Sequence, residues 1–217
     1  MTITLTTSHI AKNIVVEYEN KEQWHVVESA LQKINSGPIG HELLVELRDI
    51  SVRGKNIKIT PNEIDTFIAP RLTMSQIKRF NVPYDEFDSY HSEIAESLAR
   101  RDGLVSKGPG TSATVYWNPA LSAGIKDDGH PFPILDPSIS YVSLSHELIH
   151  AYHIVDGVYH GGIKDNNFDP ASQNAIEEFK TVGLREYSSE RFSENLIRLE
   201  HGLPFRQFYS IDPQDDF

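Results

Sequence analysis

The spacing of apolar residues predicts that much of this chain is helical. Between residues 21 and 34, apolar side chains recur at steps of three and four residues (Trp24, Val27, Leu31 and Ile34), as they do on one face of an amphipathic helix. The same periodicity predicts further helices at about residues 41–50, 84–101, 140–155, 173–184 and 193–201.

Alternation of apolar and polar residues predicts two short strands. Ile57 and Ile59 alternate with polar neighbours, and a second strand is expected at residues 112–117, just before an Asn-Pro turn. Residues 127–137 are rich in proline and are expected to form a loop. Because no repeat and no domain boundary interrupts these elements, they predict a single α+β domain.

The amino-terminal end is expected to differ from the rest of the chain. Residues 1–18 begin with several Ser and Thr and show little apolar periodicity, so we expect a polar, mobile leader there. The leader lacks the basic start and the apolar core of a cleavable secretory signal. One folded domain is then expected at residues 19–217.

Composition and charge exclude several classes of function. The 217 residues carry a net charge of -11 and include no cysteine. An acidic chain is a poor candidate for sequence-independent binding of nucleic acid, which needs a basic face. No stretch approaches the roughly 18 consecutive apolar residues of a membrane-spanning helix. We therefore expect neither a nucleic-acid nor a membrane partner, and the lack of cysteine excludes disulfides, thiolate metal ligands and a cysteine nucleophile.

The segment His146-Glu147-Leu148-Ile149-His150 carries the clearest chemistry. Residues four apart lie on the same face of a helix, so both imidazoles can reach one zinc ion. Glu147 lies one step round the helix, where it can reach a water molecule on the metal and act as the general base. The alternative is a structural helix with two histidines that bind no metal, but we expect a zinc site.

A catalytic zinc site needs three protein ligands and one open position. Glu177 and Glu178 follow His150 by 27 and 28 residues, far enough for a second helix to fold back across the first. One carboxylate could bind the metal while its neighbour orients a histidine, or the pair could be solvated in the first turn of a helix. Other acidic or imidazole candidates in this stretch are His153, Asp156, Asp165 and Asp169.

The segments HELIHAYHIVDG and EEFKTVG resemble the light chains of clostridial neurotoxins. In those toxins the second glutamate of the pair binds zinc and the first supports a ligand, which implies these roles for Glu178 and Glu177. The toxins also use an Arg-x-x-Tyr pair that faces the scissile carbonyl, and Arg206 and Tyr209 have this spacing. The resemblance thus implies that Arg206 and Tyr209 stabilise the oxyanion.

A longer series of motifs is similar to the NleD-type effector metallopeptidases, which Gram-negative pathogens inject into host cells by type III secretion. Four blocks between Lys107 and Tyr209 carry this similarity: GPGTSATVYWNP, SHELIHAYH, EEFKTVGL and SENLIRLEHGLPFRQFY. The resemblance implies a zincin-like zinc metalloendopeptidase with one zinc ion per chain. It also implies a secretion signal in the leader, recognition by the type III machinery and delivery into the host cytoplasm.

This resemblance further implies a host protein as the substrate. Known relatives of this kind cleave mitogen-activated protein kinases such as JNK and p38, which we therefore expect as targets. The alternative function is a catalytically inactive, zinc-binding effector that serves as a host-protein binding module. Residues 112–117 are a candidate edge strand for pairing with a substrate backbone, although their pattern fits an interior strand equally well. Glu200 and His201 are expected to serve capping and packing.

Overall fold

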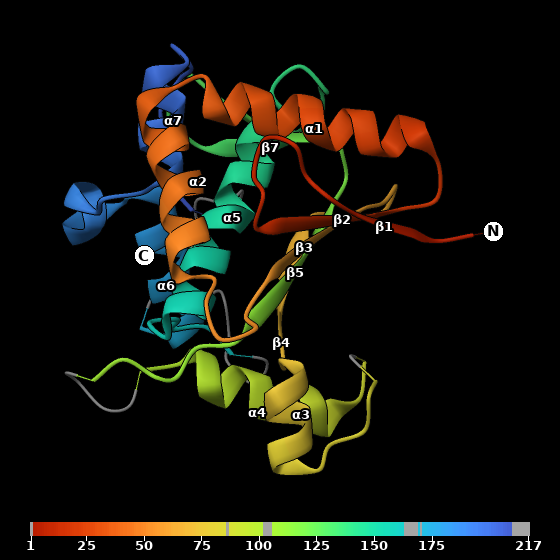
Figure 1. The fold of residues 1–217 in the computed structure, drawn as a ribbon. Helices are drawn as coiled ribbons and strands as arrows, with labels where there is room; N and C mark the ends of the chain where they lie inside the picture. The colour runs from red at the N-terminus through yellow and green to blue at the C-terminus, as the bar shows by residue number, and fades with distance from the viewer. Residues whose placement is uncertain (1, 86, 102–105, 163–168, 170, 210–217) are drawn as a thin grey trace.

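The computed structural model describes residues 2–85, 87–101, 106–162, 169 and 171–209 (Figure 1). Its helices are α1 (Lys21–Asn35), α2 (Pro38–Ile50), α3 (Met74–Phe80), α4 (Ser89–Ala99), α5 (Ser140–Asp156), α6 (Gln173–Val182) and α7 (Glu194–Glu200), with a short 3-10 helix, η1 (Arg185–Ser189). Its strands are β1 (Thr4–Thr7), β2 (Ile14–Tyr18), β3 (Ile57–Pro61), β4 (Phe67–Arg71), β5 (Ser112–Trp117), β6 (Leu121–Ile125) and β7 (Pro131–Leu135). The chain therefore has the α+β fold that the sequence predicts.

Five of the strands form one mixed sheet in the order β1-β2-β3-β5-β4. The central strands β2, β3 and β5 run parallel, whereas β1 and β4 run antiparallel to their neighbours. Strands β6 and β7 form a separate antiparallel hairpin. The strand predicted at residues 112–117 is confirmed as β5, and it lies inside the sheet, between β3 and β4.

The helix α5 lies at the centre of the domain (Figure 1). It contacts the sheet mainly through β5 and also through β4, and it packs against α1, α2, α4, α6 and α7. Its side chains are buried around most of its circumference, including Leu144, Leu148 and Ile154. Gly157 ends the helix in a left-handed conformation, with φ of 75°, which an L side chain adopts only with strain. A helix packed on all sides holds its polar side chains in fixed positions.

The periodicity-based predictions of α1, α2, α5, α6 and α7 agree with the structure within a few residues. The expected helix at residues 84–101 begins only at Ser89, where the Asp88 carboxylate accepts hydrogen bonds from the backbone amides of Tyr90 and His91. The expected loop at residues 127–137 is wrong over β7, because its prolines fall in a two-stranded hairpin that needs few backbone donors.

The expectation of a mobile leader at residues 1–18 disagrees with the structure. Strand β2 pairs with β3, and its side chains Ile14 and Val16 are fully buried in the core. Strand β1 then pairs with β2 and forms one edge of the sheet. A parallel strand at the centre of a sheet is short and apolar, so it lacks the long periodicity by which helices are recognised. Among the described residues, no helix combines the length and the apolar character needed to cross a bilayer.

Candidate metal centre and active site

His146 and His150 occupy successive turns of α5 and point the same ring nitrogen towards each other. Their Nε2 atoms are 3.1 Å apart, and the rings meet nearly edge to face. Two lone pairs at this separation repel each other unless a cation or a shared proton lies beside them. The pair therefore forms one side of a cation site.

Glu178 completes a group of three donors from the facing helix α6. Its Oε2 lies 3.1 Å from Nε2 of His146, and its Oε1 lies 3.4 Å from Nε2 of His150. The Ser172 hydroxyl fixes the start of α6 by accepting a hydrogen bond from the backbone amide of Ala175. The folded chain thus brings together residues 28 to 32 positions apart in the sequence.

These three donors have the chemistry and the spacing of a zinc site. Two imidazoles and a carboxylate are common zinc ligands, and tetrahedral bonds of about 2.0–2.1 Å place donor atoms about 3.3 Å from one another. The separations of 3.1 to 3.4 Å among His146, His150 and Glu178 match that value. All three donor atoms also lie within 4.8 Å of one another, as a shared ion requires.

Glu177 fixes the orientation of His150 by contacting Nδ1, the ring nitrogen that does not face the proposed ion. Its Oε1 lies 2.9 Å from Nδ1 of His150 and 2.6 Å from Nδ1 of His153, and its Oε2 accepts a hydrogen bond from the backbone amide of His160. The side chain is almost completely buried. A carboxylate held in this way selects the tautomer of His150 that presents Nε2 to a metal. His153 therefore contacts the glutamate rather than the site of the ion.

Glu194 plays the equivalent part for His146, and the sequence analysis did not identify it. This first residue of α7 places Oε2 2.9 Å from Nδ1 of His146. Arg198 donates a hydrogen bond to Oε1 at 2.7 Å, and Arg206 donates one to Oε2 at 3.0 Å. The spacing of Glu194 and Arg198, four residues apart on a helix, was visible in the sequence. The contact of the Glu194 carboxylate with His146, 48 residues away, was not visible in the sequence.

The buried charges of this cluster support one another. Burial lowers the pKa of His146, but hydrogen bonds to Glu178 and Glu194 outweigh it and raise this pKa to about 9. Burial alone would raise the pKa of Glu178, yet the nearby His150 and His146 hold it well below its usual range. The raised histidine pKa values and the lowered pKa of Glu178 thus show that this cluster favours positive charge among its carboxylates, a charge that a divalent cation would supply when bound.

Glu147 lies beside the donor group but outside it. Its side chain is buried, and burial raises the pKa of its carboxyl, while the neighbouring His146 and His150 oppose that rise. A carboxylate with a raised pKa is a stronger base and accepts a proton more readily. The position one residue after His146 gives Glu147 the geometry of a proton acceptor next to the cation site.

Arg206 and Tyr209 reach the site from a segment that follows α7. Besides Glu194, the Arg206 guanidinium donates to the backbone carbonyls of Phe208 and Tyr209, so it is engaged on three sides. The Tyr209 ring packs edge to face against Phe179 of α6. Burial and the nearby charge of Glu178 raise the pKa of Tyr209, so its phenol keeps its proton.

The β6–β7 hairpin supports this segment. Gln207 donates its backbone amide to the carbonyl of Gly129 at 3.0 Å, and the rings of His130 and Phe208 stack at 3.8 Å with an interplanar angle of 6°. Asn195 at the start of α7 exchanges two hydrogen bonds with the backbone of Arg206. These contacts fix the backbone between Arg206 and Tyr209, the two side chains that the resemblance implies act together.

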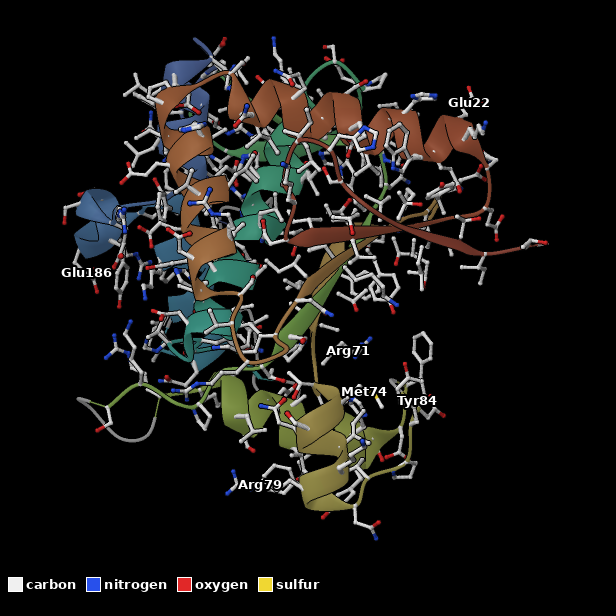
Figure 2. The ribbon with its side chains drawn as sticks, viewed as in Figure 1. Glu22, Arg71, Met74, Arg79, Tyr84 and Glu186 are labelled. Atoms are coloured by element: carbon white, nitrogen blue, oxygen red, sulfur yellow. The ribbon has the colours of Figure 1, made fainter. Side chains whose placement is uncertain are left out.

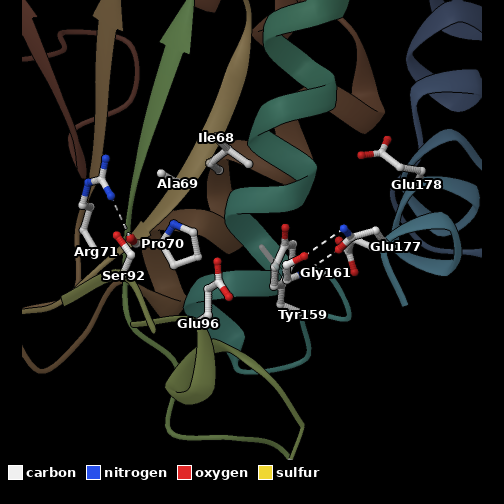
Figure 3. A pocket seen from close by; sticks show the side chains of 12 residues that line it. Ile68, Ala69, Pro70, Arg71, Ser92, Glu96, Tyr159, Gly161, Glu177 and Glu178 are labelled. Carbon is white, nitrogen blue, oxygen red and sulfur yellow. Dashed lines mark hydrogen bonds between the residues drawn. The ribbon is translucent and has the colours of Figure 1, made fainter. Parts of the chain in front are cut away.

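A pocket of about 240 Å³ opens beside the donor group (Figure 3). One wall is strand β4, with Ile68 and Pro70, and the opposite wall carries Glu177 and Glu178. Tyr159, which the sequence analysis missed, lies between them. Its ring meets the His150 ring nearly at right angles with the ring centres 6.3 Å apart, and burial together with Glu177 and Glu178 raises its pKa well above the usual value.

The other sequence candidates lie apart from this cluster. Asp156 forms an ion pair with Lys107 at 2.6 Å, and Asp165 lies outside the described residues. Asp169 accepts a hydrogen bond from the backbone amide of Ala171, just before α6. Glu200 caps the start of α2 by accepting hydrogen bonds from two backbone amides, which confirms the capping role predicted for it.

Comparison with known proteins places these features in context. The protein family described as "Peptidase_M91: Effector protein" matches residues 12–209. The chain is similar to the catalytic domain of Clostridium botulinum neurotoxin serotype F, with 19% identity and a TM-score of 0.44, over 75% of this chain and 42% of that one. It is also similar to the botulinum neurotoxin type D light chain, with 15% identity and a TM-score of 0.47, over 87% of this chain and 58% of that one. The chain thus spans about half the length of these structures, and none of the curated proteins matches it.

Proposed function

The chain belongs to the Peptidase M91 family of effector proteins, and from this premise we propose that it is a zinc-dependent endopeptidase that cleaves a host protein. One observation carries the proposal: His146, His150 and Glu178 converge at the spacing of zinc ligands beside a buried glutamate. The peptidase class follows from the family, whereas zinc as the metal and a host protein as the substrate are our proposals.

His146, His150 and Glu178 would hold the zinc ion. When bound, zinc supplies a Lewis acid that polarises the peptide carbonyl and lowers the pKa of water. Glu177 and Glu194 support this role because each accepts a hydrogen bond from the Nδ1 of one histidine, which keeps Nε2 available. Such supporting carboxylates typically contribute about 10- to 100-fold to metal affinity.

Glu147 is the proposed general base. Its buried carboxylate takes a proton from the attacking water and later returns that proton to the leaving amine. Burial favours both steps, because it raises the pKa of the carboxyl towards the range in which proton exchange is efficient. A glutamine at this position has nearly the same shape but accepts no proton.

Tyr209 and Arg206 are proposed to act on the oxyanion with different roles. Burial and the negative charge of Glu178 keep the phenol of Tyr209 protonated and neutral, so it can donate a hydrogen bond to an oxygen that develops negative charge. The Arg206 guanidinium already donates to Glu194 and to two carbonyls. We therefore assign Arg206 the positioning of Tyr209 and Glu194, with its positive charge helping the oxyanion from nearby.

Strand β4 is the proposed support for the substrate backbone. Within the described part of the chain, β4 pairs with β5 alone, so its other edge can pair with an extended polypeptide. Ile68, Ala69 and Pro70 of this strand line the pocket beside Glu178 (Figure 3). The interior position of β5 leaves β4 as the strand that fills the role considered for residues 112–117.

We propose delivery by type III secretion into the host cytoplasm and, on the NleD-type resemblance, mitogen-activated protein kinases such as JNK and p38 as substrates. An inactive binding module would need a metal ligand or the base to be missing, and each of these groups is present.

The test is to incubate zinc-loaded protein with purified JNK and p38, with a Glu147→Gln variant as control. New kinase fragments with the wild type alone would support the proposal, and intact kinases would exclude these targets.

A further inference from the structure

The face of the five-stranded sheet that points away from α5 is hollowed by a groove of about 890 Å³. Because side chains alternate along a strand, Ile57 and Val115 point into the core, whereas Lys58 and Thr114 point to this opposite face. Helix α3 and the segment that follows it form the other wall. We call this feature the outer-sheet groove; its lining includes Leu5, Lys58, Arg71, Met74, Tyr84 and Phe87.

Large apolar side chains gather at this groove and are exposed to solvent. The exposed fractions are 60% for Leu5, 55% for Met74, 81% for Tyr84 and 75% for Phe87. Single exposed apolar residues are ordinary, but a cluster around a concave surface is typical of a binding site. These residues come from β1, from α3 and from the segment after it, so no single local feature of the sequence explains their association.

The groove adjoins the pocket of the proposed active site at one residue. Arg71, the last residue of β4, lines both the pocket beside Glu178 and the outer-sheet groove. Its guanidinium carbon lies 5.7 Å from the centre of the Phe87 ring. Figure 2 shows Arg71 and Met74 near each other at the lower end of the sheet, with Tyr84 on the same side of the molecule. The two cavities therefore share a wall.

The charge of the lining differs from that of the whole chain. The groove is lined by three cations, Arg53, Lys58 and Arg71, and by two carboxylates, Glu17 and Asp85, of which Glu17 pairs with Lys58 at 3.1 Å. The chain as a whole has 20 Lys and Arg against 31 Asp and Glu. A ligand with acidic groups would therefore meet less repulsion here than on the rest of the surface.

We propose that the outer-sheet groove binds a second segment of the substrate protein, apolar with some acidic residues and a few positions away from the cleaved bond. This inference rests on the proposed peptidase function. An extended chain advances about 3.3 Å per residue, so a polypeptide paired with the five residues of β4 reaches Arg71 within roughly five positions. The same substrate chain can then occupy the pocket and the groove together. Recognition therefore extends beyond the residues next to the cleaved bond.

Site-specific photo-crosslinking identifies what occupies the groove. The photoreactive residue p-benzoylphenylalanine replaces Phe87 in the inactive Glu147→Gln variant, and in a control it replaces Leu135, which is 79% exposed on β7. Both proteins are expressed in host cells, and the new amino termini produced by the wild type are identified in parallel. Position 87, but not position 135, should crosslink to the same protein that the wild type cleaves.

Other crosslinking results would overturn the inference. A second copy of this chain or an uncleaved protein as the main product would assign the groove to a different occupant. Equal crosslinking of the cleaved protein at positions 87 and 135 would mean that the groove has no preference for it. If the wild type creates no new amino termini, the proposed function fails and the groove inference fails with it. If new amino termini appear but position 87 does not crosslink preferentially to the cleaved protein, the groove inference alone fails, so the two failures are distinguishable.

Kinetics with two substrates supply an independent measurement. The double variant Met74→Ser/Phe87→Ser should raise KM for the intact substrate protein by about tenfold, because exposed apolar contacts are lost. The same variant should cleave a short peptide around the cleaved bond as fast as the wild type, and the Leu135→Ser control should match the wild type on both substrates. An equal loss on peptide and protein would instead place the effect in the active site.

Discussion

Oε2 of Glu194 lies 2.9 Å from Nδ1 of His146, so the first residue of α7 fixes a proposed zinc ligand 48 positions earlier in the chain. The same carboxylate receives hydrogen bonds from Arg198 and Arg206. A single buried glutamate thus connects the metal ligand with the arginine expected near the oxyanion. Loss of this glutamate should affect both functions.

Replacement of Glu194 by glutamine should weaken zinc binding by about 10- to 100-fold, as is typical for residues that orient a metal-bound histidine. The amide keeps the size of the side chain but loses the negative charge that favours the required tautomer of His146. Competition with a metal-sensitive dye measures the affinity. The control is Glu186→Gln, an exposed glutamate on η1 that should leave the affinity unchanged. Unchanged affinity in both variants would contradict the role of Glu194.

The two adjacent glutamates of α6 should differ sharply. Glu178→Ala removes a proposed ligand and should yield protein without zinc after dialysis against metal-free buffer. Glu177→Gln retains a hydrogen-bond acceptor near His150 and should keep zinc with an affinity lower by about 10- to 100-fold. Elemental analysis of the dialysed proteins gives the metal content. The opposite order would show that the ligand and its support are exchanged.

The phenol of Tyr209 should affect kcat but not zinc binding. Tyr209→Phe removes a single donor and should lower kcat by about 10²–10³-fold, the usual loss when one oxyanion donor is removed. The ring keeps its contact with Phe179, so the fold and the zinc content should not change. The measurement is kcat with the cleaved substrate, compared with zinc content in the same preparation. A wild-type kcat would assign oxyanion stabilisation elsewhere.

The ion pair between Arg198 and Glu194 should be important for stability. Both side chains are 2–3% exposed, so Arg198→Met leaves a buried carboxylate with fewer partners. We expect the free energy of unfolding to fall by about 3 kcal/mol, at the low end for buried pairs because Arg206 and His146 still face Glu194. Urea unfolding measures the difference in free energy.

A surface ion pair provides the matched control for this stability measurement. Arg191 pairs with Glu42 and Glu46, but its side chain is 49% exposed. Arg191→Met should therefore lower the free energy of unfolding by less than about 1 kcal/mol. Similar losses for the two arginine variants would argue against a special contribution from the buried pair.

Much of the fold could be predicted because the helices are amphipathic over several turns. Helix α1 shows the required spacing, whereas α5, which is buried on nearly all sides, was predicted from the apolar stripe beside its two histidines. The missed strands are short: β2 has five residues, and β4 contains Pro70, which disfavours prediction as a strand. Pairing between distant strands depends on the whole sheet and is therefore absent from any local window.

The residues of the candidate site also fall into two groups: those that local spacing predicts and those whose positions depend on the whole fold. His146 and His150 are recognisable from local spacing, since a helix fixes the distance between residues four apart. Glu178 could be chosen over its neighbour only through the toxin-like pattern. Glu194 and Tyr159 could not be identified, because their positions depend on how α7 and the segment after α5 fold back on the metal site.

The central claim is that α5 and α6 together hold one zinc ion and that Glu147 is the base for peptide hydrolysis. It is tested most directly by measuring zinc per chain and peptide-bond cleavage on the same samples of wild type, Glu147→Gln and His150→Ala. We predict one zinc ion per chain in the first two proteins, cleavage by the wild type alone, and no zinc in His150→Ala. Cleavage by Glu147→Gln at the wild-type rate, or a full complement of zinc in His150→Ala, would contradict the account.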